Sequence, residues 1–338
     1  MNTKEEPHKD FSIPSKTGLS IKARARWIAS EHLIWVILLA LVLFGLSVDG
    51  FASQRNFINV LWAASPLGMM VLGLYFVMIA GRLDLSLESS LVFAPTVAIV
   101  AMTEWFIGMD PLLAIAITIL VGALVGIFNG LVSVILGVNA FLVTLATLII
   151  MRGAVVFLIP EGVYNLPEIY TDLGGTRLFG VFPLAVIVLV IAFLISYLIM
   201  KGTAFGRSLI GIGNNEEACR VAGINVKAVL IGAFMLAGIC SSIGGLLQVG
   251  RLFSVDATMG EGDILIVFAA VTLGGTALTG GRGSVSGLLG AILVIGLITN
   301  LMNLIGVAVS IQEIVFGAVL LIAIILSSVQ DRLRSHGG

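Results

Sequence analysis

Stretches of mostly apolar residues recur along nearly the whole chain, with only short polar segments between them. A bilayer has a hydrocarbon core about 30 Å thick, which a helix of roughly 20 residues crosses. Glu88 and Pro95 interrupt the third stretch, and Gly274 and Gly275 shorten the eighth. The pattern predicts an all-α polytopic membrane protein with ten transmembrane helices, at residues 32–49, 57–80, 85–103, 111–136, 140–159, 180–200, 228–249, 263–279, 284–304 and 308–328.

The distribution of basic residues predicts the direction in which the spans run. With the N-terminus in the cytosol, the inner segments hold fourteen Lys and Arg residues and the outer segments hold three, while Arg152 lies within a span. Cytosolic loops of membrane proteins carry such an excess. Because the number of spans is even, both termini are predicted to be cytosolic, with a tail at 1–30, a transmembrane domain at 31–330 and a second tail at 331–338.

The composition excludes several other classes of protein. Hydrophobic residues make up 59% of the 338 residues and charged residues 11%, and the mean hydropathy is +1.14. Soluble domains average about 25% charged residues, so this chain has too few to cover a water-facing surface. A net charge of −1 gives no basic field for nucleic acid, so no nucleic-acid partner is expected. Two cysteines are too few for a disulfide framework.

Residues for catalysis or metal binding do not occur at useful spacings. The histidines, His8, His32 and His336, lie near the ends of the chain, and neither cysteine has a Cys or His at ligand spacing. The segment 275–282 resembles a phosphate loop but has Gly281 where that loop needs lysine. We therefore predict no catalytic residues, no metal and no cofactor in this chain, and any ATP hydrolysis is expected on another subunit.

A short polar helix is predicted at 214–224, within the inner segment between the sixth and seventh spans. Asn214 or Asn215 can cap its N-terminus, and two glutamates, Glu216 and Glu217, then face the positive end of its dipole. Gly223 can end it in the left-handed conformation. The pattern predicts a compact helix presented to the cytosol. The same residues also fit an ordinary loop helix that only links two spans.

Three segments resemble one known family. Glu217-Ala218-Cys219-x-x-x-Gly223 is similar to the Glu-Ala-Ala-x-x-x-Gly coupling motif of permeases in importers of the ATP-binding-cassette class, with Cys219 replacing the second alanine. The longer segments 204–226, 273–287 and 80–90 resemble the ribose-type sugar permease family. In the last of these, Arg82 and Glu88 stand where that family usually has glycine.

The resemblance implies a function and a set of partners. The chain is expected to be the permease subunit of an importer in the bacterial inner membrane, which moves a sugar or sugar-like polyol by alternating access. It implies a second permease chain, identical or a paralogue, a cytosolic ATP-binding subunit that holds ATP and Mg, and a periplasmic solute-binding protein. The residues expected to couple the chain to the ATPase are Asn214, Glu216, Glu217, Ala218 and Gly223.

Polar residues within or beside the spans are the candidates for substrate binding. Ionisable groups are costly in hydrocarbon, and amide or carboxylate groups can bind sugar hydroxyls. The candidates are Asp84, Glu88, Asn129, Arg152, Asn300 and Asn303. Hydrogen bonding between helices explains the same residues. The similar settings of Asn129 and Asn300, in the fourth and ninth spans, are also compatible with an inverted repeat of two five-helix halves.

Two other functions remain open from the sequence. A proton-coupled secondary transporter of a small polar solute would use Asp84, Glu88 or Glu313 as a proton relay and would need no ATPase. An intramembrane transferase or hydrolase is disfavoured, because the sequence offers no set of nucleophilic or metal-binding residues.

Overall fold

The computed structural model describes residues 34–335, with side chains described up to residue 325. The predicted N-terminal tail at 1–30 lies outside the described residues. The principal helices are Ile34–Gly45, α2 (Gln54–Met78), α3 (Leu87–Val100) with its π-helical extension η1 (Ala101–Trp105), α4 (Pro111–Val134), α5 (Ala140–Leu158), α7 (Leu184–Gly202), α10 (Val226–Leu252), α11 (Asp263–Leu273), α12 (Val285–Leu304) and α13 (Val309–Ser335). Helix α13 continues into the first part of the predicted C-terminal tail.

These helices occur at the positions of the predicted spans. Seven of the described helices are long and apolar enough to cross a membrane: α2, α3 with η1, α4, α5, α7, α10 and α12. Shorter apolar helices, Ile34–Gly45, α11 and the apolar part of α13, occupy the positions of the first, eighth and tenth predicted spans. Helix α11 ends at Leu273 because Gly274 and Gly275 follow, and Gly275 has a φ of +88°. The helical class is therefore confirmed, while the count of ten spans stays a prediction.

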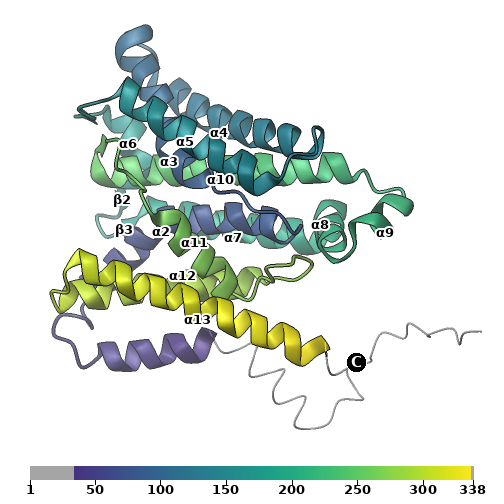
Figure 1. Cartoon of the computed structure of the whole chain (residues 1–338). Coiled ribbons are helices and arrows are strands. Elements are labelled where there is room, and N and C mark those ends of the chain that lie inside the picture. The colour runs from purple at the N-terminus through teal and green to yellow at the C-terminus, as the bar shows by residue number, and fades with distance from the viewer. Residues whose placement is uncertain (1–33, 336–338) are drawn as a thin grey trace, which may run out of the picture.

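Helix α10 lies at the centre of the bundle. Figure 1 shows it between α3, α4 and α5 on one side and α2 and α7 on the other. Glycines make this packing close. A Cβ at Gly126 of α4 would overlap the carbonyl oxygen of Phe234, and one at Gly238 would overlap that of Gly122. Small residues allow this approach of helix backbones in membrane proteins.

Large apolar side chains on the outside of α4, α5 and α7 are exposed. Examples are Leu124, Ile150 and Leu194, which are 54%, 68% and 57% exposed. Such wide apolar surfaces are typical of helices that face lipid. The chain is therefore a multi-pass membrane protein.

The short elements gather at the two ends of the bundle. At one end lie α6 (Glu168–Gly175) and the hairpin of β2 (Arg177–Leu178) with β3 (Phe182–Pro183); β1 (Val163–Tyr164) pairs antiparallel with β4 (Ser254–Val255). At the opposite end lie α8 (Ala204–Asn214) and α9 (Glu216–Val221), as Figure 1 shows. Two interhelical connections, residues 79–86 and 274–284, approach α8 and α9.

Candidate functional site: a polar end and a buried polar interior

Helix α9 is the short capped helix that the sequence predicts. The Asn215 side chain accepts a hydrogen bond from the backbone N–H of Ala218 at 2.9 Å, so Asn215 rather than Asn214 is the N-cap. Glu216 and Glu217 form its first turn, and Gly223 follows its end with a φ of +82°. These three features agree with the predicted cap, acidic first turn and left-handed stop.

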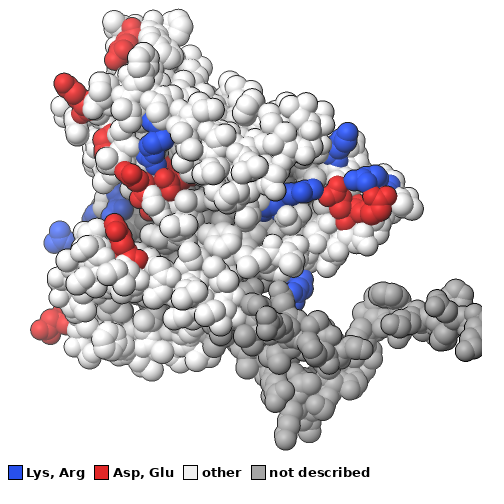
Figure 2. Space-filling model, viewed as in Figure 1, with Lys and Arg blue, Asp and Glu red and all other residues white. Residues whose placement is uncertain are grey.

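The outer face of α9 is exposed and carries paired charges. Arg220 bonds to Glu216 at 2.9 Å and also to Glu217. Ala218 is exposed, and Val221 is 82% exposed. Figure 2 shows acidic and basic side chains gathered at this end of the molecule, while most of the visible surface between the two ends is uncharged. The helix therefore presents a compact surface of mixed charge.

Two contacts join the α8–α9 segment to the rest of the bundle. The guanidinium of Arg82, which follows α2, lies 2.8 Å from the carboxylate of Glu216. The side-chain amide of Asn214 donates to the carbonyl of Gly281 at 3.1 Å, and the N–H of Gly281 donates to the carbonyl of Ile79 at 2.7 Å. The three segments that carry the family resemblance therefore meet at one place.

Asp84 and Asn129 belong to one buried polar network. The backbone N–H and the hydroxyl of Ser86 donate to Asp84 Oδ1 at 2.9 and 2.6 Å. Asn129 donates to Ser86 Oγ at 2.8 Å and accepts from Thr147 Oγ1 at 2.7 Å. The network links the start of α3 to α4 and α5. Asp84 Oδ2 has no hydrogen-bond partner among the described residues.

The buried position of Asp84 affects its ionisation. The residue lies in the connection between α2 and α3, outside both helices, and is fully buried. Burial raises the pKa of its carboxyl from 3.8 to about 6, while the hydrogen bonds from Ser86 lower it. The hydrogen bonds from Ser86 therefore stabilise the ionised form of Asp84, and burial destabilises it by more.

Glu88 and Arg152 form a second buried group. Arg152 on α5 donates to Glu88 Oε1 at 3.0 Å, and its other donors reach the carbonyls of Ala257 and Met259 at 2.7 and 3.1 Å. Glu88 Oε2 accepts from the N–H of Ile264 at the start of α11 at 3.2 Å. This ion pair therefore ties α3 and α5 to the segment that leads into α11.

The two remaining substrate candidates lie in separate places. Asn300 exchanges two hydrogen bonds with Asn56, at 3.0 and 2.7 Å, which join α12 to α2. Asn303 accepts from Gln312 at 2.9 Å, which joins α12 to α13. The six candidates are thus spread over four groups, and in this conformation their polar atoms bond mainly to other parts of the chain. Asn129 and Asn300 have different partners, so the inverted repeat stays a prediction.

No sequence pattern indicated Asn56, Gln312 or the carbonyls of Ala257 and Met259 as partners of the candidate residues. Asn56 lies three residues after Ser53, which caps α2, so it looks like an ordinary residue of a first turn. Carbonyl groups carry no signal in a sequence. Only the tertiary structure could identify these partners.

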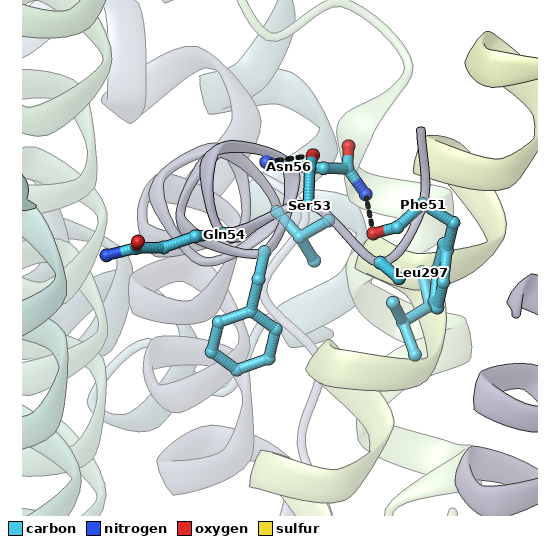
Figure 3. Close-up of a pocket in the computed structure, with 8 residues that line it drawn as sticks. Phe51, Ser53, Gln54, Asn56 and Leu297 are labelled. Carbon is cyan, nitrogen blue, oxygen red and sulfur yellow. Dashed lines mark hydrogen bonds between the residues drawn. The ribbon is translucent and has the colours of Figure 1, made fainter. Parts of the chain in front are cut away.

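A groove of about 290 Å³ lies beside the Asn56–Asn300 pair. Phe51, Val60, Phe57 and Leu297 line it together with Ala52, Ser53, Gln54 and Asn56. Figure 3 shows that Asn56 bonds to the carbonyl of Phe51 and that Gln54 points away from Phe51 and Leu297. The lining is mostly apolar, so it lacks the convergent polar groups that a sugar needs.

The described residues contain no group of three or more His, Cys, Asp or Glu side chains that could hold a metal ion. Both cysteines are free and buried. The polar residues described above bond mainly between helices or lie at the α8–α9 end.

Comparison with known proteins agrees with the resemblance in the motifs. Residues 56–324 match the model of the family described as branched-chain amino acid transport system / permease component. The chain is 34% identical to the ribose import permease protein RbsC of Bacillus subtilis (strain 168) over 293 residues, which cover 84% of this chain and 87% of that protein.

Other relatives are similar over even more of the chain. It is 30% identical to RbsC of Escherichia coli (strain K12), over 89% of this chain and 94% of that protein. It is also 30% identical to the L-arabinose ABC transporter permease protein AraH of Azospirillum brasilense, over 95% of each chain. No solved structure matches the chain. The family comprises transport permeases rather than enzymes, and this chain belongs to it, as a relative of the permeases of sugar importers of the ATP-binding-cassette class.

Proposed function

We propose that the chain is the permease subunit of an ATP-binding-cassette importer that carries a sugar or sugar-like polyol across the bacterial inner membrane. In this proposal the ten apolar helices all span the membrane, both termini are cytosolic, and alternating access moves the cargo. A separate cytosolic subunit binds ATP and Mg and hydrolyses the ATP. A periplasmic solute-binding protein delivers the cargo, and a second permease chain completes the transmembrane part.

The observation that carries the proposal is the α8–α9 end. A permease that a separate ATPase subunit drives needs an exposed segment that this subunit can displace. Here α9 is capped by Asn215, is exposed at Val221, and is joined to two interhelical connections by Arg82 and Asn214. A helix with such contacts can transmit a displacement by the ATPase subunit to the two connections.

A neutral, hydroxylated cargo fits the buried chemistry. Asn, Ser and Thr side chains offer both donors and acceptors for hydroxyl groups. The network of Ser86, Asn129 and Thr147 has these groups, and its bonds would have to exchange for bonds to a cargo during transport. Relatives named for ribose and L-arabinose make these two pentoses the first cargoes to test.

The test is uptake by the purified chain in vesicles, with and without its partners. We expect uptake of labelled ribose or L-arabinose only when an ATPase subunit and a solute-binding protein are present with ATP. A non-hydrolysable ATP analogue is the matched control and should give none. Uptake by the chain alone, driven by a pH gradient, would instead support a proton-coupled secondary transporter that uses Asp84 or Glu88.

A further inference from the structure

The connection between α2 and α3 is held in a fixed position at its start. The N–H of Gly81 donates to the carbonyl of Met78 at 2.9 Å, and that of Arg82 donates to the carbonyl of Val77 at 3.2 Å. Gly81 has a φ of +75°. This is the pattern of a Schellman motif, which ends a helix with a defined turn. The Arg82 backbone is therefore rigidly attached to the end of α2.

Both contacts from the α8–α9 segment arrive at this connection. Arg82 pairs with Glu216, the first residue of α9, and Asn214 bonds to Gly281, which in turn bonds to Ile79. Backbones are close here as well, because a Cβ at Gly213 would overlap the carbonyl oxygen of Ile79 and the amide nitrogen of Gly281. The C-terminal end of α8, which leads directly into α9, is therefore packed against this connection.

The far end of the same connection is bonded to α4 and α5. The N–H of Leu85 donates to Thr144 Oγ1 at 3.1 Å, and Asp84 and Ser86 join Asn129 and Thr147 in the buried network. Only one residue separates Arg82 from Asp84. A continuous set of contacts thus runs from the exposed helix α9 to hydrogen bonds between α3, α4 and α5.

We infer that Arg82 is a positioning residue that, together with Asn214, makes α9 and the α2–α3 connection move as one body, so that motion at α9 displaces the start of α3 relative to α4 and α5. This rests on the proposed function, since it names the route by which the ATPase acts. The Arg82–Glu216 pair is 42% and 34% exposed, and exposed ion pairs contribute little stability. The pair therefore adds little to the stability of the fold, so a loss of transport in its variants reports on positioning and not on unfolding.

The test is a double-variant cycle in the reconstituted importer, with cargo transported per ATP hydrolysed as the readout. Arg82→Gln and Glu216→Gln should each lower this ratio at least about twofold. The double variant should be no worse than Glu216→Gln alone, because Glu216→Gln already removes the contact with Arg82. Glu217 also bonds to Arg220 but not to Arg82, so Arg82→Gln and Glu217→Gln are the matched control and should combine multiplicatively.

Two further measurements separate a positioning role from a general defect. Arg82→Lys keeps the charge and should recover most of the ratio, while the affinity of Arg82→Gln for the ATPase subunit should stay near that of the wild type. A ratio in Arg82→Gln equal to the wild type, or multiplicative effects of Arg82→Gln with Glu216→Gln, would overturn the inference. A wild-type complex without ATP-driven uptake would instead overturn the proposed function.

Discussion

Two ion pairs in this protein have the same chemistry and opposite surroundings. Arg82 and Glu216 meet at the α8–α9 end, where their side chains are 42% and 34% exposed. Arg152 and Glu88 meet inside the bundle, where theirs are 18% and 8% exposed, and both bond to further backbone groups. Water can replace the first pair but cannot easily replace the second. The comparison indicates that the inner pair stabilises the fold, whereas the outer pair can be broken and re-formed at little cost in stability.

Removing the inner cation should have the largest effect on stability. Arg152→Met removes the cation from beside the buried Glu88, which keeps the Ile264 N–H, and it takes the donor away from the carbonyls of Ala257 and Met259. Loss of one partner of a buried pair costs about 3–5 kcal/mol. We expect a marked fall in the melting temperature of the chain in detergent.

The double variant Arg152→Met with Glu88→Met is the control for this prediction. It removes both charges, so it should recover part of the lost stability. A melting temperature of Arg152→Met equal to the wild type would show that the inner pair does not hold the fold.

Asp84 allows the effect of burial on the ionisation of a carboxyl group to be tested. Its folded pKa of about 6 exceeds the ordinary value of 3.8, so the folded state binds the proton more tightly and loses stability as the pH rises from about 4 to about 6. The shift corresponds to about 3 kcal/mol at most. Asp84→Asn cannot ionise and keeps an oxygen that accepts from Ser86.

We therefore expect the melting temperature of Asp84→Asn, relative to the wild type, to rise between pH 4.5 and pH 7. Scans of both proteins at matched pH values measure this difference. A constant difference across this range would show that Asp84 does not carry a raised pKa.

Glu88→Gln should have a smaller effect than the loss of Arg152. Glutamine retains an oxygen that can accept from Arg152 or from Ile264, and Arg152 keeps its bonds to Ala257 and Met259. Replacing a charge-assisted bond by a neutral one costs about 1–2 kcal/mol. A melting temperature as low as that of Arg152→Met would mean that the charge of Glu88, rather than its hydrogen bonding, is what the interior requires.

The outer pair should give the smallest effect on stability. Arg82→Gln removes an exposed ion pair, so we expect the free energy of unfolding to change by less than about 0.5 kcal/mol. Melting in detergent beside Arg152→Met checks this directly. A destabilisation as large as that of Arg152→Met would remove the distinction between the two pairs.

Local sequence signals predicted α9 and the apolar helices but neither of the two ion pairs. The cap, acidic turn and stop of α9 lie within nine residues, from Asn215 to Gly223, and the apolar stretches are equally local, so both could be located from sequence. Arg82 and Glu216 lie 134 residues apart, and Glu88 and Arg152 lie 64 apart. Their pairing depends on how the helices pack, which no local pattern encodes.

The candidate cargo site shows the same limit. The chemistry of Asn300 indicated a polar role, but its reciprocal bonding with Asn56 depends on the contact of α12 with α2. Amides that bind a cargo and amides that join helices have the same sequence signature. Only partners in space distinguish them, and these partners can change between conformations.

The most direct test of the account is cross-linking at the two ends of the molecule in membranes that contain the ATPase subunit. Val221 on α9 and Phe179 between β2 and β3 are 82% and 101% exposed. Figure 1 shows α9 at one end of the molecule and the β2–β3 hairpin at the other. Val221→Cys should cross-link to the ATPase subunit through a short bifunctional reagent, whereas Phe179→Cys and the wild type, whose two cysteines are buried, should not. Cross-linking from Phe179→Cys and none from Val221→Cys would contradict the proposal that the ATPase subunit binds at α9.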